Sequence, residues 1–347
     1  MIRNNVTMRD IAEKLNVSVV TVSKALNDKE GVSDQLKYKI KETASELGYR
    51  FNLAAKSMKE GFSYNIGVVI PARFAGPNQS FYLQFYQTIA RALGDFNYYG
   101  ILYVLSLEEE QELLLPRLYH ERKVDGFIIL GQISSEYIEL LKTMETPYVF
   151  LDFYTDETEV DSVITDNYYA MYEMTNYLIK NGHRDIAFVG SIHSTSSIQD
   201  RFLGYYKSLL EHRIPLVDEY VIPDRDESGN YIQIQLPKQM PTAFVCNCDQ
   251  VAYNVIGVLV KNGYSVPDDC SVAGFDNDLY ATISKPNLTT IEVDMEKMSE
   301  TAIRAVVSQI KDDQAAQGRI LVKGRIVYRD SVKPLISREM GAEPSKI

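Results

Sequence analysis

The chain has 347 residues, too many for one ordinary domain, and its 45% hydrophobic and 24% charged residues are typical of a globular protein. No apolar run reaches the roughly 18 residues of a membrane span. The amino terminus has no apolar signal region, and the three cysteines match no metal-binding spacing. We therefore expect a cytoplasmic protein with no disulfide framework, no metal and no membrane partner.

The formal net charge of −11 is distributed unevenly along the chain. Residues 1–61 hold 11 Lys and Arg against 8 Asp and Glu, whereas the remaining residues hold 25 and 39. A small basic segment can approach phosphate groups while an acidic body stays away from them, so the asymmetry permits a nucleic-acid partner. The same small excess of positive charge is also unremarkable for a segment of this size.

The first 50 residues predict three short helices, each with its own capping residue. Thr7 precedes apolar residues that recur at the spacing of one helical face. Ser18 caps a second helix over residues 19–26, and Ser33 caps a third helix that ends at Gly48. Two short helices joined by a tight turn and followed by a third form a helix-turn-helix unit.

The second of these helices is the predicted reader of DNA, because its amino-terminal residues meet base edges in the major groove in such units. Val19 and Val20 face outward and would touch thymine methyl groups. Thr21 and Ser23 suit phosphate oxygens, and Lys24 suits either a phosphate or a guanine edge. The alternative is that the two valines pack on a neighbouring helix.

This segment resembles the DNA-binding headpiece of the LacI family of bacterial transcription regulators. The family pattern reads T-x-x-D-I-A, then V-S-x-x-T-V-S-[RK]-x-L-N, then L-G-Y-x-x-N-x-x-A. The residues that carry the resemblance are Thr7, Asp10, Ile11, Ala12, Val17, Ser18, Thr21, Val22, Ser23, Lys24, Leu26, Asn27, Leu47, Gly48, Tyr49, Asn52 and Ala55. The resemblance implies a homodimer on a pseudo-palindromic double-stranded operator, with further DNA contacts from Thr7, Asn27, Tyr49, Asn52, Ala55 and Met58.

Three residues depart from the family pattern. Phe51 stands in place of the usual proline. Met58 replaces the leucine that wedges into the minor groove, and methionine can still act as an apolar wedge. Lys24 replaces the commoner arginine and lacks its bidentate fork, so recognition of that base is expected to be softer.

Residues 52–59 are the predicted hinge helix. Asn52 can cap it, and Ala54 and Ala55 are small enough to let a second copy approach. A helix of about seven residues is not stable alone in water, so we expect it to fold only when two copies meet on DNA. Residues 1–61 would thus form the headpiece with its hinge.

From Tyr64 onward, short apolar strands alternate with amphipathic helices. The predicted strands are residues 66–70, 101–105, 126–130, 148–151, 162–165, 186–189, 243–246 and 271–273, and the predicted helices include 83–96, 168–179, 198–210, 251–260 and 295–310. The alternation predicts doubly wound parallel sheets. Neither a G-x-G-x-x-G nor a G-x-x-x-x-G-K-[ST] motif is present, so no dinucleotide or nucleotide cofactor is expected.

The body also resembles the LacI family core, which has two lobes of the periplasmic-binding-protein type. The resemblance implies a body over residues 62–340. Its first lobe would comprise about 62–155 and 293–322, and its second lobe about 160–285 and 325–340. It also implies an effector in the cleft between the lobes, at the carboxyl ends of the strands.

Three charged residues stand where such a cleft would lie, and in the family the matching positions contact the effector. Asp152 and Asp276 follow strands, and Arg201 lies near the start of a helix. A carboxylate accepts hydrogen bonds from sugar hydroxyls, and arginine donates a planar fork. Phe81 and Tyr82 would cover the apolar face of a sugar. These residues predict a sugar-binding site.

Each of these charges also has a purely structural interpretation. Asp152 could cap a turn, Asp276 could cap a loop, and Arg201 could pair with Asp200 or Glu211 on its own helix.

The neighbouring positions modify the predicted sugar site. Cys248 is a further effector-binding candidate, at a position where relatives often carry asparagine, while the adjacent Asn247 is expected to point to the other side of its strand. Asp249 and Asp166 are interpreted as helix caps rather than ligands. The cysteine weakens the hydroxyl-binding network or adapts it to another sugar.

Together these features predict a DNA-binding repressor of carbohydrate-utilisation genes, controlled by a small sugar or related effector. One alternative is a cytoplasmic sugar-binding sensor without a DNA function. An enzyme is the other alternative, because four histidines and many acids are present. However, no G-x-S-x-G nucleophile elbow occurs, and His183 lies in a helix-to-strand turn where a structural role is expected.

Overall fold

The computed structural model describes residues 6–49, 57, 60–76, 80–156, 160–226, 229–312 and 317–335. The chain divides into two compact units, Met1–Phe62 and Ser63–Ile347, which we call the headpiece and the body. Across the described ranges, every helix falls short of the length and apolar character that a bilayer crossing requires.

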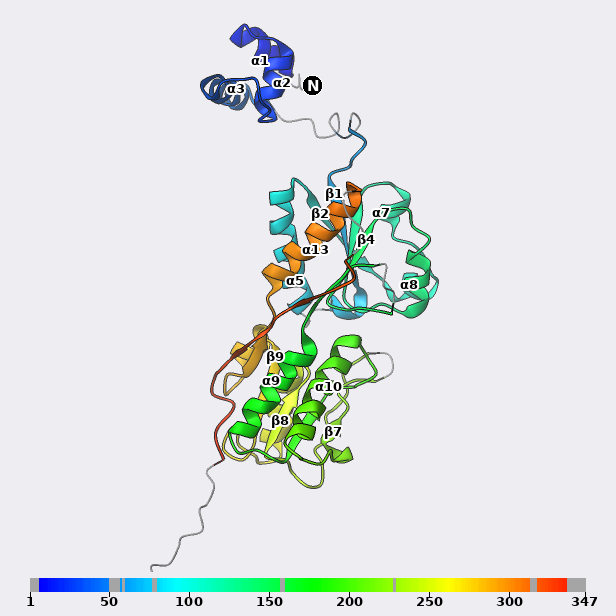
Figure 1. Ribbon diagram of the computed structural model, residues 1–347, viewed down its shortest axis with the longest axis vertical. Helices are drawn as coiled ribbons and strands as arrows, with labels where there is room; N and C mark the ends of the chain where they lie inside the picture. The colour runs from blue at the N-terminus through cyan, green and yellow to red at the C-terminus, as the bar shows by residue number, and fades with distance from the viewer. Residues whose placement is uncertain are drawn as a thin grey trace, which may run out of the picture. The chain divides into compact units, whose positions relative to one another are not determined.

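The headpiece contains α1 (Met8–Leu15), α2 (Val19–Leu26) and α3 (Asp34–Glu46) (Figure 1). Local capping sets their ends. The Asp10 carboxylate accepts hydrogen bonds from the backbone and hydroxyl of Thr7, and Ser18 Oγ accepts one from the Thr21 amide at 3.0 Å. The three helices share one small core made of Ile11, Ala12, Val22, Ala25, Ile40 and Ala44. The predicted helix-turn-helix unit is confirmed.

Most of the predicted hinge lies outside the described residues. This applies to Asn52, Ala55 and Met58, and Ser57 is the one described residue between 52 and 59.

The body contains two six-stranded sheets that share one strand order. In the first sheet the order is β11-β5-β4-β3-β1-β2; its strands are β1 (Asn65–Pro71), β2 (Tyr99–Leu105), β3 (Gly126–Leu130), β4 (Tyr148–Leu151), β5 (Ser162–Thr165) and β11 (Arg319–Val322). In the second sheet the order is β12-β10-β9-β8-β6-β7; its strands are β6 (Ile186–Val189), β7 (Val221–Ile222), β8 (Ala243–Cys246), β9 (Ser271–Asp276), β10 (Thr289–Glu292) and β12 (Arg325–Val327).

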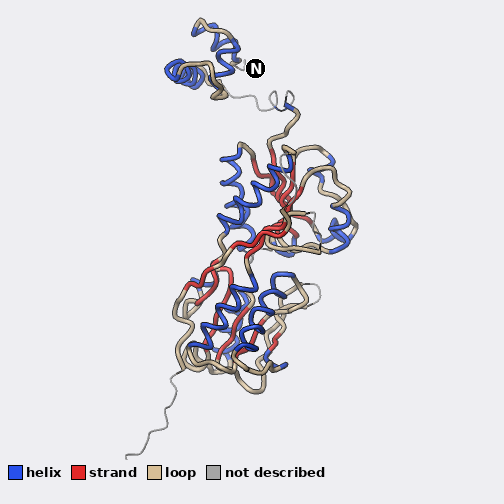
Figure 2. Tube along the Cα trace, viewed as in Figure 1, coloured by secondary structure: helices blue, strands red, loops and turns tan. Residues whose placement is uncertain are grey.

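Helices cover both sheets, as Figure 2 shows. The first lobe carries α5 (Ser80–Leu93), α6 (Leu107–Gln111), α7 (Arg117–His120), α8 (Ser135–Leu141) and α13 (Met295–Ile310). The second lobe carries α9 (Asn167–Lys180), α10 (Ser196–Glu211), α11 (Asp249–Lys261) and α12 (Leu279–Ile283). Short 3-10 turns lie at Ala72–Phe74, Gly94–Phe96 and Asp218–Tyr220.

In these mostly parallel sheets the connecting helices cover both faces, so most strands are buried on both sides, as the fully buried β3 and β8 illustrate. The two-lobed α/β fold predicted from the sequence is confirmed. The antiparallel pair of β10 and β12 is an exception to the predicted parallel pairing.

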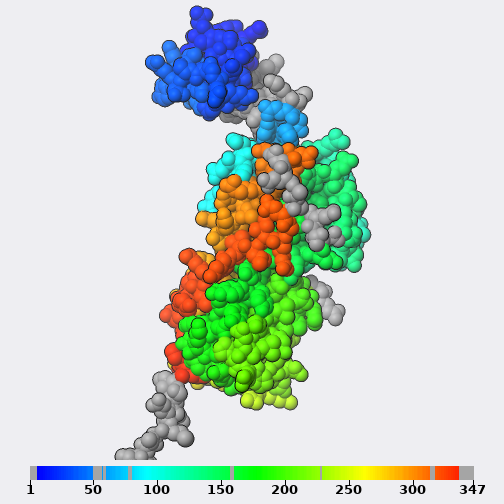
Figure 3. Space-filling view, in the orientation of Figure 1, coloured from blue at the N-terminus to red at the C-terminus, as the bar shows by residue number. Residues whose placement is uncertain are grey.

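The chain passes between the lobes three times: after β5, between β10 and α13, and between β11 and β12. In Figure 3 the last described segment, coloured red, runs over the surface from the first lobe onto the second.

The predicted lobe boundaries need two corrections. The first lobe was expected to end its first segment at about residue 155, with the second lobe starting at about 160. Instead β5 pairs with β4 and with β11 in the first sheet. The second lobe also continues past residue 285, because β10 pairs with β9. A four-residue apolar strand fits either sheet, so its sequence carries no sign of which lobe it joins.

Candidate functional site

The exposed side of α2 forms the first candidate site. Val22 and Ala25 are buried against the headpiece core, whereas Val19 is 43% and Val20 is 65% exposed. The alternative that these valines pack on a neighbouring helix is therefore wrong. Two exposed valines at the head of a helix leave apolar surface free for a partner.

The polar residues on and next to α2 differ in solvent exposure and in their hydrogen bonds. Lys24 is exposed, and Thr21 and Ser23 are half-buried. Thr21 Oγ1 lies 2.8 Å from Ser18 Oγ, and Asn27 donates from its amide to the Ser23 carbonyl at 2.7 Å. The side chains of Thr21 and Asn27 are thus already held by hydrogen bonds at the two ends of α2.

Two predicted DNA contacts lie outside α2. Thr7 is exposed at the start of α1 and hydrogen-bonded to Asp10. Tyr49 is half-buried against the headpiece core, and this burial raises the pKa of its phenol.

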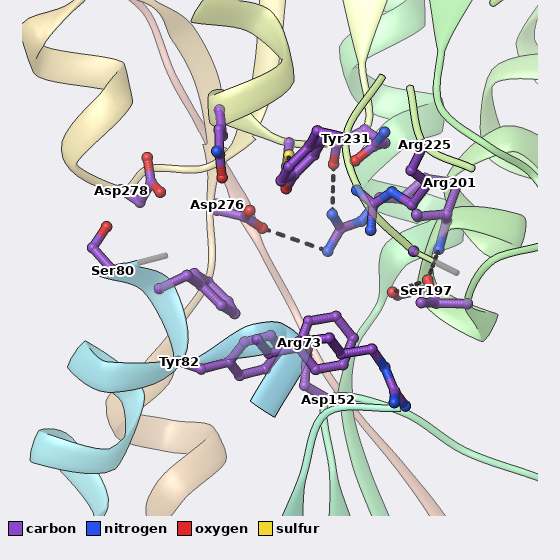
Figure 4. Close-up of a pocket in the computed structure, with 18 residues that line it drawn as sticks. Arg73, Ser80, Tyr82, Asp152, Ser197, Arg201, Arg225, Tyr231, Asp276 and Asp278 are labelled. Carbon is purple, nitrogen blue, oxygen red and sulfur yellow. Dashed lines mark hydrogen bonds and ion pairs between the residues drawn. The ribbon is translucent and has the colours of Figure 1, made fainter. Parts of the chain in front are cut away.

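The second candidate site is a cavity of about 90 Å³ between the two lobes of the body (Figure 4). All six residues predicted to bind an effector line it: Phe81, Tyr82, Asp152, Arg201, Cys248 and Asp276. The first three belong to the first lobe and the others to the second, so the cavity combines residues from two separate sheets.

Asp152 and Asp276 occupy matching positions in the two lobes, directly after β4 and at the end of β9. Asp152 has a backbone φ of 67° and Asp276 one of 108°, a region that non-glycine residues rarely adopt. Such strained positions concentrate at functional sites.

The carboxyl groups of these two residues are buried and only partly bonded. Tyr82 donates its hydroxyl to Oδ2 of Asp152 at 2.8 Å. Oδ1 of Asp152 and Oδ1 of Asp276 have no hydrogen-bond partner among the described residues. Burial raises the pKa of Asp152, and it raises that of Asp276 well above the ordinary value. Both oxygens therefore favour a hydrogen-bond donor.

Arg201 fixes the second-lobe wall of the cavity. Its Nε donates to Oδ1 of Asn167 at 2.8 Å, and its Nη1 donates to the Asn247 carbonyl at 2.5 Å. Its Nη2 lies 3.5 Å from Oδ1 of Asp276, and the guanidinium lies 3.6 Å from the centre of the Phe275 ring. Arg201 thus bonds across elements rather than pairing with Asp200 or Glu211, the structural alternative considered above.

Residues 247–249 follow the end of β8, and the positions of Asn247 and Asp249 differ from those predicted. Asn247 lines the cavity together with Cys248, because the strand ends at Cys246 and its alternation no longer applies. Burial raises the pKa of Cys248 to about 12, so its thiol stays protonated. Asp166 caps α9 as predicted.

Asp249 does not cap α11. It is the first residue of that helix, and its carboxylate accepts hydrogen bonds from the Asp278 amide at 3.0 Å and the Thr290 hydroxyl at 2.6 Å. These bonds tie the start of α11 to two neighbouring segments of the second lobe.

Several residues that line the cavity were not predicted. They are Arg73, Phe74, Ser80, Thr195, Ser197, Ile198, Arg225, Gly229, Tyr231, Gln250 and Asp278. Arg73 could have been found, because it follows the end of the first strand, where a cleft residue is expected. Arg225 and Tyr231 lie in an irregular segment whose path the sequence does not reveal.

His183 has the structural role that the sequence predicted. His183 is buried, with its ring nitrogens 3.0 Å from the Thr242 hydroxyl and 3.1 Å from the Lys333 carbonyl. Within the described part of the chain, no group of His, Cys, Asp or Glu could hold a metal ion.

Comparisons with known proteins bear on both candidate sites. Residues 7–52 match the family model described as "Bacterial regulatory proteins, lacI family", and residues 175–332 match the "Periplasmic binding protein-like domain". The probable HTH-type transcriptional repressor ExuR of Bacillus subtilis (strain 168) is 30% identical, covering 95% of this chain and 99% of that protein. The HTH-type transcriptional regulator RegA of Clostridium acetobutylicum is 32% identical, covering 94% and 99%.

Solved structures show the same fold over nearly the whole chain. The lac repressor bound to ONPG in the repressed state superposes with a TM-score of 0.70 at 23% identity, covering 95% of this chain and 100% of that one. The transcriptional regulator CelR in complex with cellobiose superposes with a TM-score of 0.66 at 22% identity, covering 94% and 100%.

Proposed function

This chain belongs to the lacI family of bacterial regulatory proteins, and we propose that it represses carbohydrate-utilisation genes under the control of a sugar bound between its lobes. The family resemblance predicted from the headpiece motifs is confirmed. As a member of this family, the chain is a DNA-binding transcriptional regulator and not an enzyme. A regulator of this kind works on chromosomal DNA, which supports our inference that it is cytoplasmic.

One observation supports the effector part of the proposal most strongly: buried carboxylate oxygens that accept no hydrogen bond from the described residues line one cavity from both lobes. Asp152 and Asp276 can each accept a hydrogen bond from a sugar hydroxyl, and Phe81 and Tyr82 can cover an apolar ring face. A sugar that bonds both acids holds the lobes together. It therefore binds the closed arrangement better than an open one, which is the differential affinity that allosteric control requires.

For DNA recognition we propose that α2 enters the major groove. Val19 and Val20 would contact thymine methyl groups, Thr21 and Ser23 would contact phosphates, and Lys24 would contact a phosphate or a guanine. Thr7, Asn27, Tyr49 and the hinge residues Asn52, Ala55 and Met58 complete the proposed contact set. Two headpieces on two-fold-related half-sites multiply the affinity through their effective concentration.

The homodimer that such an operator needs could form through the edge of the first sheet. There β2 exposes Leu102 and Val104, and neighbouring α5 exposes Leu83. An exposed apolar edge strand is a natural pairing surface. Val104→Lys should yield monomers in analytical ultracentrifugation and weaken operator binding. Leu210→Lys, at an equally exposed apolar site on α10 of the second lobe, should change neither.

Selection of random duplex DNA on the full chain tests the proposal as a whole. We expect enrichment of a pseudo-palindrome whose affinity falls steeply with salt, because several phosphates are neutralised in each half-site. A sugar that raises the melting temperature of the protein should change the affinity for this duplex by about 5- to 150-fold. Sugar binding without enrichment of any DNA sequence would instead favour the DNA-independent sensor.

A further inference from the structure

The segment that connects β7 to β8 differs from its counterpart in the first lobe. In the first lobe the equivalent connection, from β2 to β3, contains α6 and α7. Residues 223–242 of the second lobe contain no helix in their described part. A long irregular segment inside a compact lobe is more often functional than structural. This one turns back toward the cleft, and a bridge between Arg225 and Tyr231 brings both side chains to the cavity.

Buried bonds anchor the first residues of this segment. Asp224 is fully buried, and its carboxylate accepts hydrogen bonds from the Ser191 amide at 2.7 Å and the Asn247 amide group at 2.9 Å. Arg225 donates from Nη2 and Nε to the same carboxylate at 2.8 and 3.1 Å. Its guanidinium also lies 4.9 Å from the centre of the Tyr231 ring. Arg225 is therefore held in place before any ligand arrives.

One edge of this guanidinium remains available. Both bonds of Arg225 to Asp224 use Nε and Nη2, and within the described residues nothing bonds Nη1. The Arg225 side chain is only 9% exposed, and the residue lines the cavity. A guanidinium nitrogen that bonds no protein acceptor can donate to a ligand, and an anionic oxygen is the strongest acceptor.

Charged residues of both signs line the cavity, and a dashed line in Figure 4 marks the pair of Arg201 with Asp276. In this view Asp278 and Ser80 lie on the left, and the guanidinium groups of Arg225 and Arg73 lie on the right. Arg73 comes from the first lobe, where Glu110 binds it at 2.6 Å. Its Cδ would lie 3.8 Å from a Cβ added at Gly229, so it reaches the β7–β8 segment across the cleft.

We propose that the effector is a sugar with an acidic group, a carboxylate or a phosphate ester, and that Arg225 binds this group. The hydroxyls of the sugar then face Asp152 and Asp276. Arg73, which Glu110 and the Gln132 carbonyl hold in place, adds a second guanidinium from the opposite lobe, so the acidic group of the ligand joins the two lobes. This inference rests on the proposed function, because it specifies the ligand of the same cleft.

Calorimetric titration and thermal-shift measurements on the full chain test the proposal with matched ligands. The probes are D-glucose, D-glucuronate, D-gluconate and D-glucose 6-phosphate, together with the galactose counterparts. We expect at least one acid to bind about tenfold or more tightly than its neutral parent. Binding of the phosphate ester alone would support the proposal and identify phosphate as the acidic group.

Variants of Arg225 then locate the acidic group. Arg225→Met should weaken binding of the acid about tenfold or more beyond any effect on the neutral parent, and Arg225→Lys should retain part of the preference for the acid. The double variant Asp224→Asn/Arg225→Met removes both buried charges and should lose the same preference if the single variant folds poorly. Arg304→Met, outside the cavity on α13, is the matched control and should bind like the native chain.

The outcomes separate failure of this inference from failure of the proposed function. Neutral sugars that bind as tightly as their acids, or an Arg225→Met variant that keeps its preference for the acid, would overturn the acidic effector while leaving a sugar-controlled repressor. If no sugar of either class binds, the proposed sugar control fails, and the acidic effector fails with it.

Discussion

Replacing Arg201 by methionine would remove the guanidinium that fixes the second-lobe wall of the cavity. The change deletes hydrogen bonds to Asn167 and to the Asn247 carbonyl, together with the ion pair to Asp276. Methionine keeps much of the side-chain volume and favours a helix as arginine does, so the loss reports mainly on these polar contacts.

The magnitude follows from the charge that Arg201 would leave behind. Removing one partner of a buried ion pair costs about 3–5 kcal/mol, because the other charge stays buried without compensation. Asp276 can reduce this cost by binding a proton, since burial already raises its pKa well above the ordinary value. We therefore expect the free energy of unfolding to fall by about 3 kcal/mol at pH 8 and by clearly less at pH 5.

Urea denaturation of the ligand-free chain at both pH values measures this loss. Arg304→Met breaks an exposed pair with Glu300 and should cost less than about 0.5 kcal/mol. The double variant Arg201→Met/Asp276→Asn should recover at least about 1 kcal/mol of the single-variant loss. A loss no larger than that of Arg304→Met, or one that is equal at pH 5 and pH 8, would refute the reasoning.

Three further predictions concern other parts of the structure. Lys24→Ala should weaken operator binding by about 1–3 kcal/mol. Anisotropy titrations against base-substituted duplexes should show relaxed specificity at one base position if Lys24 contacts guanine. If Lys24 contacts a phosphate, affinity should fall equally for all duplexes. Because burial raises the pKa of Asp278 from 3.8 to about 6, the folded chain keeps a proton that the unfolded chain releases, and stability should fall as pH rises through this range, by up to about 3 kcal/mol. Asp278→Asn should remove that component from a pH series of urea melts, and an unchanged profile would contradict the assignment. Gly204→Ala places a Cβ 2.1 Å from the Tyr168 carbonyl and should destabilise the chain by about 1–3 kcal/mol, whereas Gly257→Ala, in open space on α11, should stabilise it by up to about 1 kcal/mol in the same melts.

Features set by local interactions could be predicted from the sequence. The bounds of α2 follow from the Ser18 cap and from the spacing of the apolar residues that come directly after it. The positions of Asp152 and Asp276 follow from the rule that clefts lie at the carboxyl ends of parallel strands. In such cases a short stretch of residues contains the whole physical argument.

Features that depend on distant parts of the chain could not be predicted in this way. On one side β5 pairs with β4, but its other neighbour in the first sheet is β11, more than 150 residues later. The place of Arg225 depends on a connection without a helix. Its orientation depends on Asp224, whose carboxylate is held by Asn247 and Ser191 from two other segments. Positive φ angles at two aspartates likewise reflect the packing around them rather than a glycine-like sequence signal.

The interleaving of the two lobes also has a consequence during protein synthesis. The first sheet is completed by β11 and covered by α13, which both follow nearly the whole second lobe in the chain. About 130 residues separate the end of β5 from the start of α13, which corresponds to roughly 6–26 seconds of translation. During that interval the open edge of β5 and the apolar face beneath α13 remain uncovered on the ribosome. Premature termination anywhere in the second lobe would therefore leave the first lobe incomplete as well, with its apolar face available to chaperones and proteases.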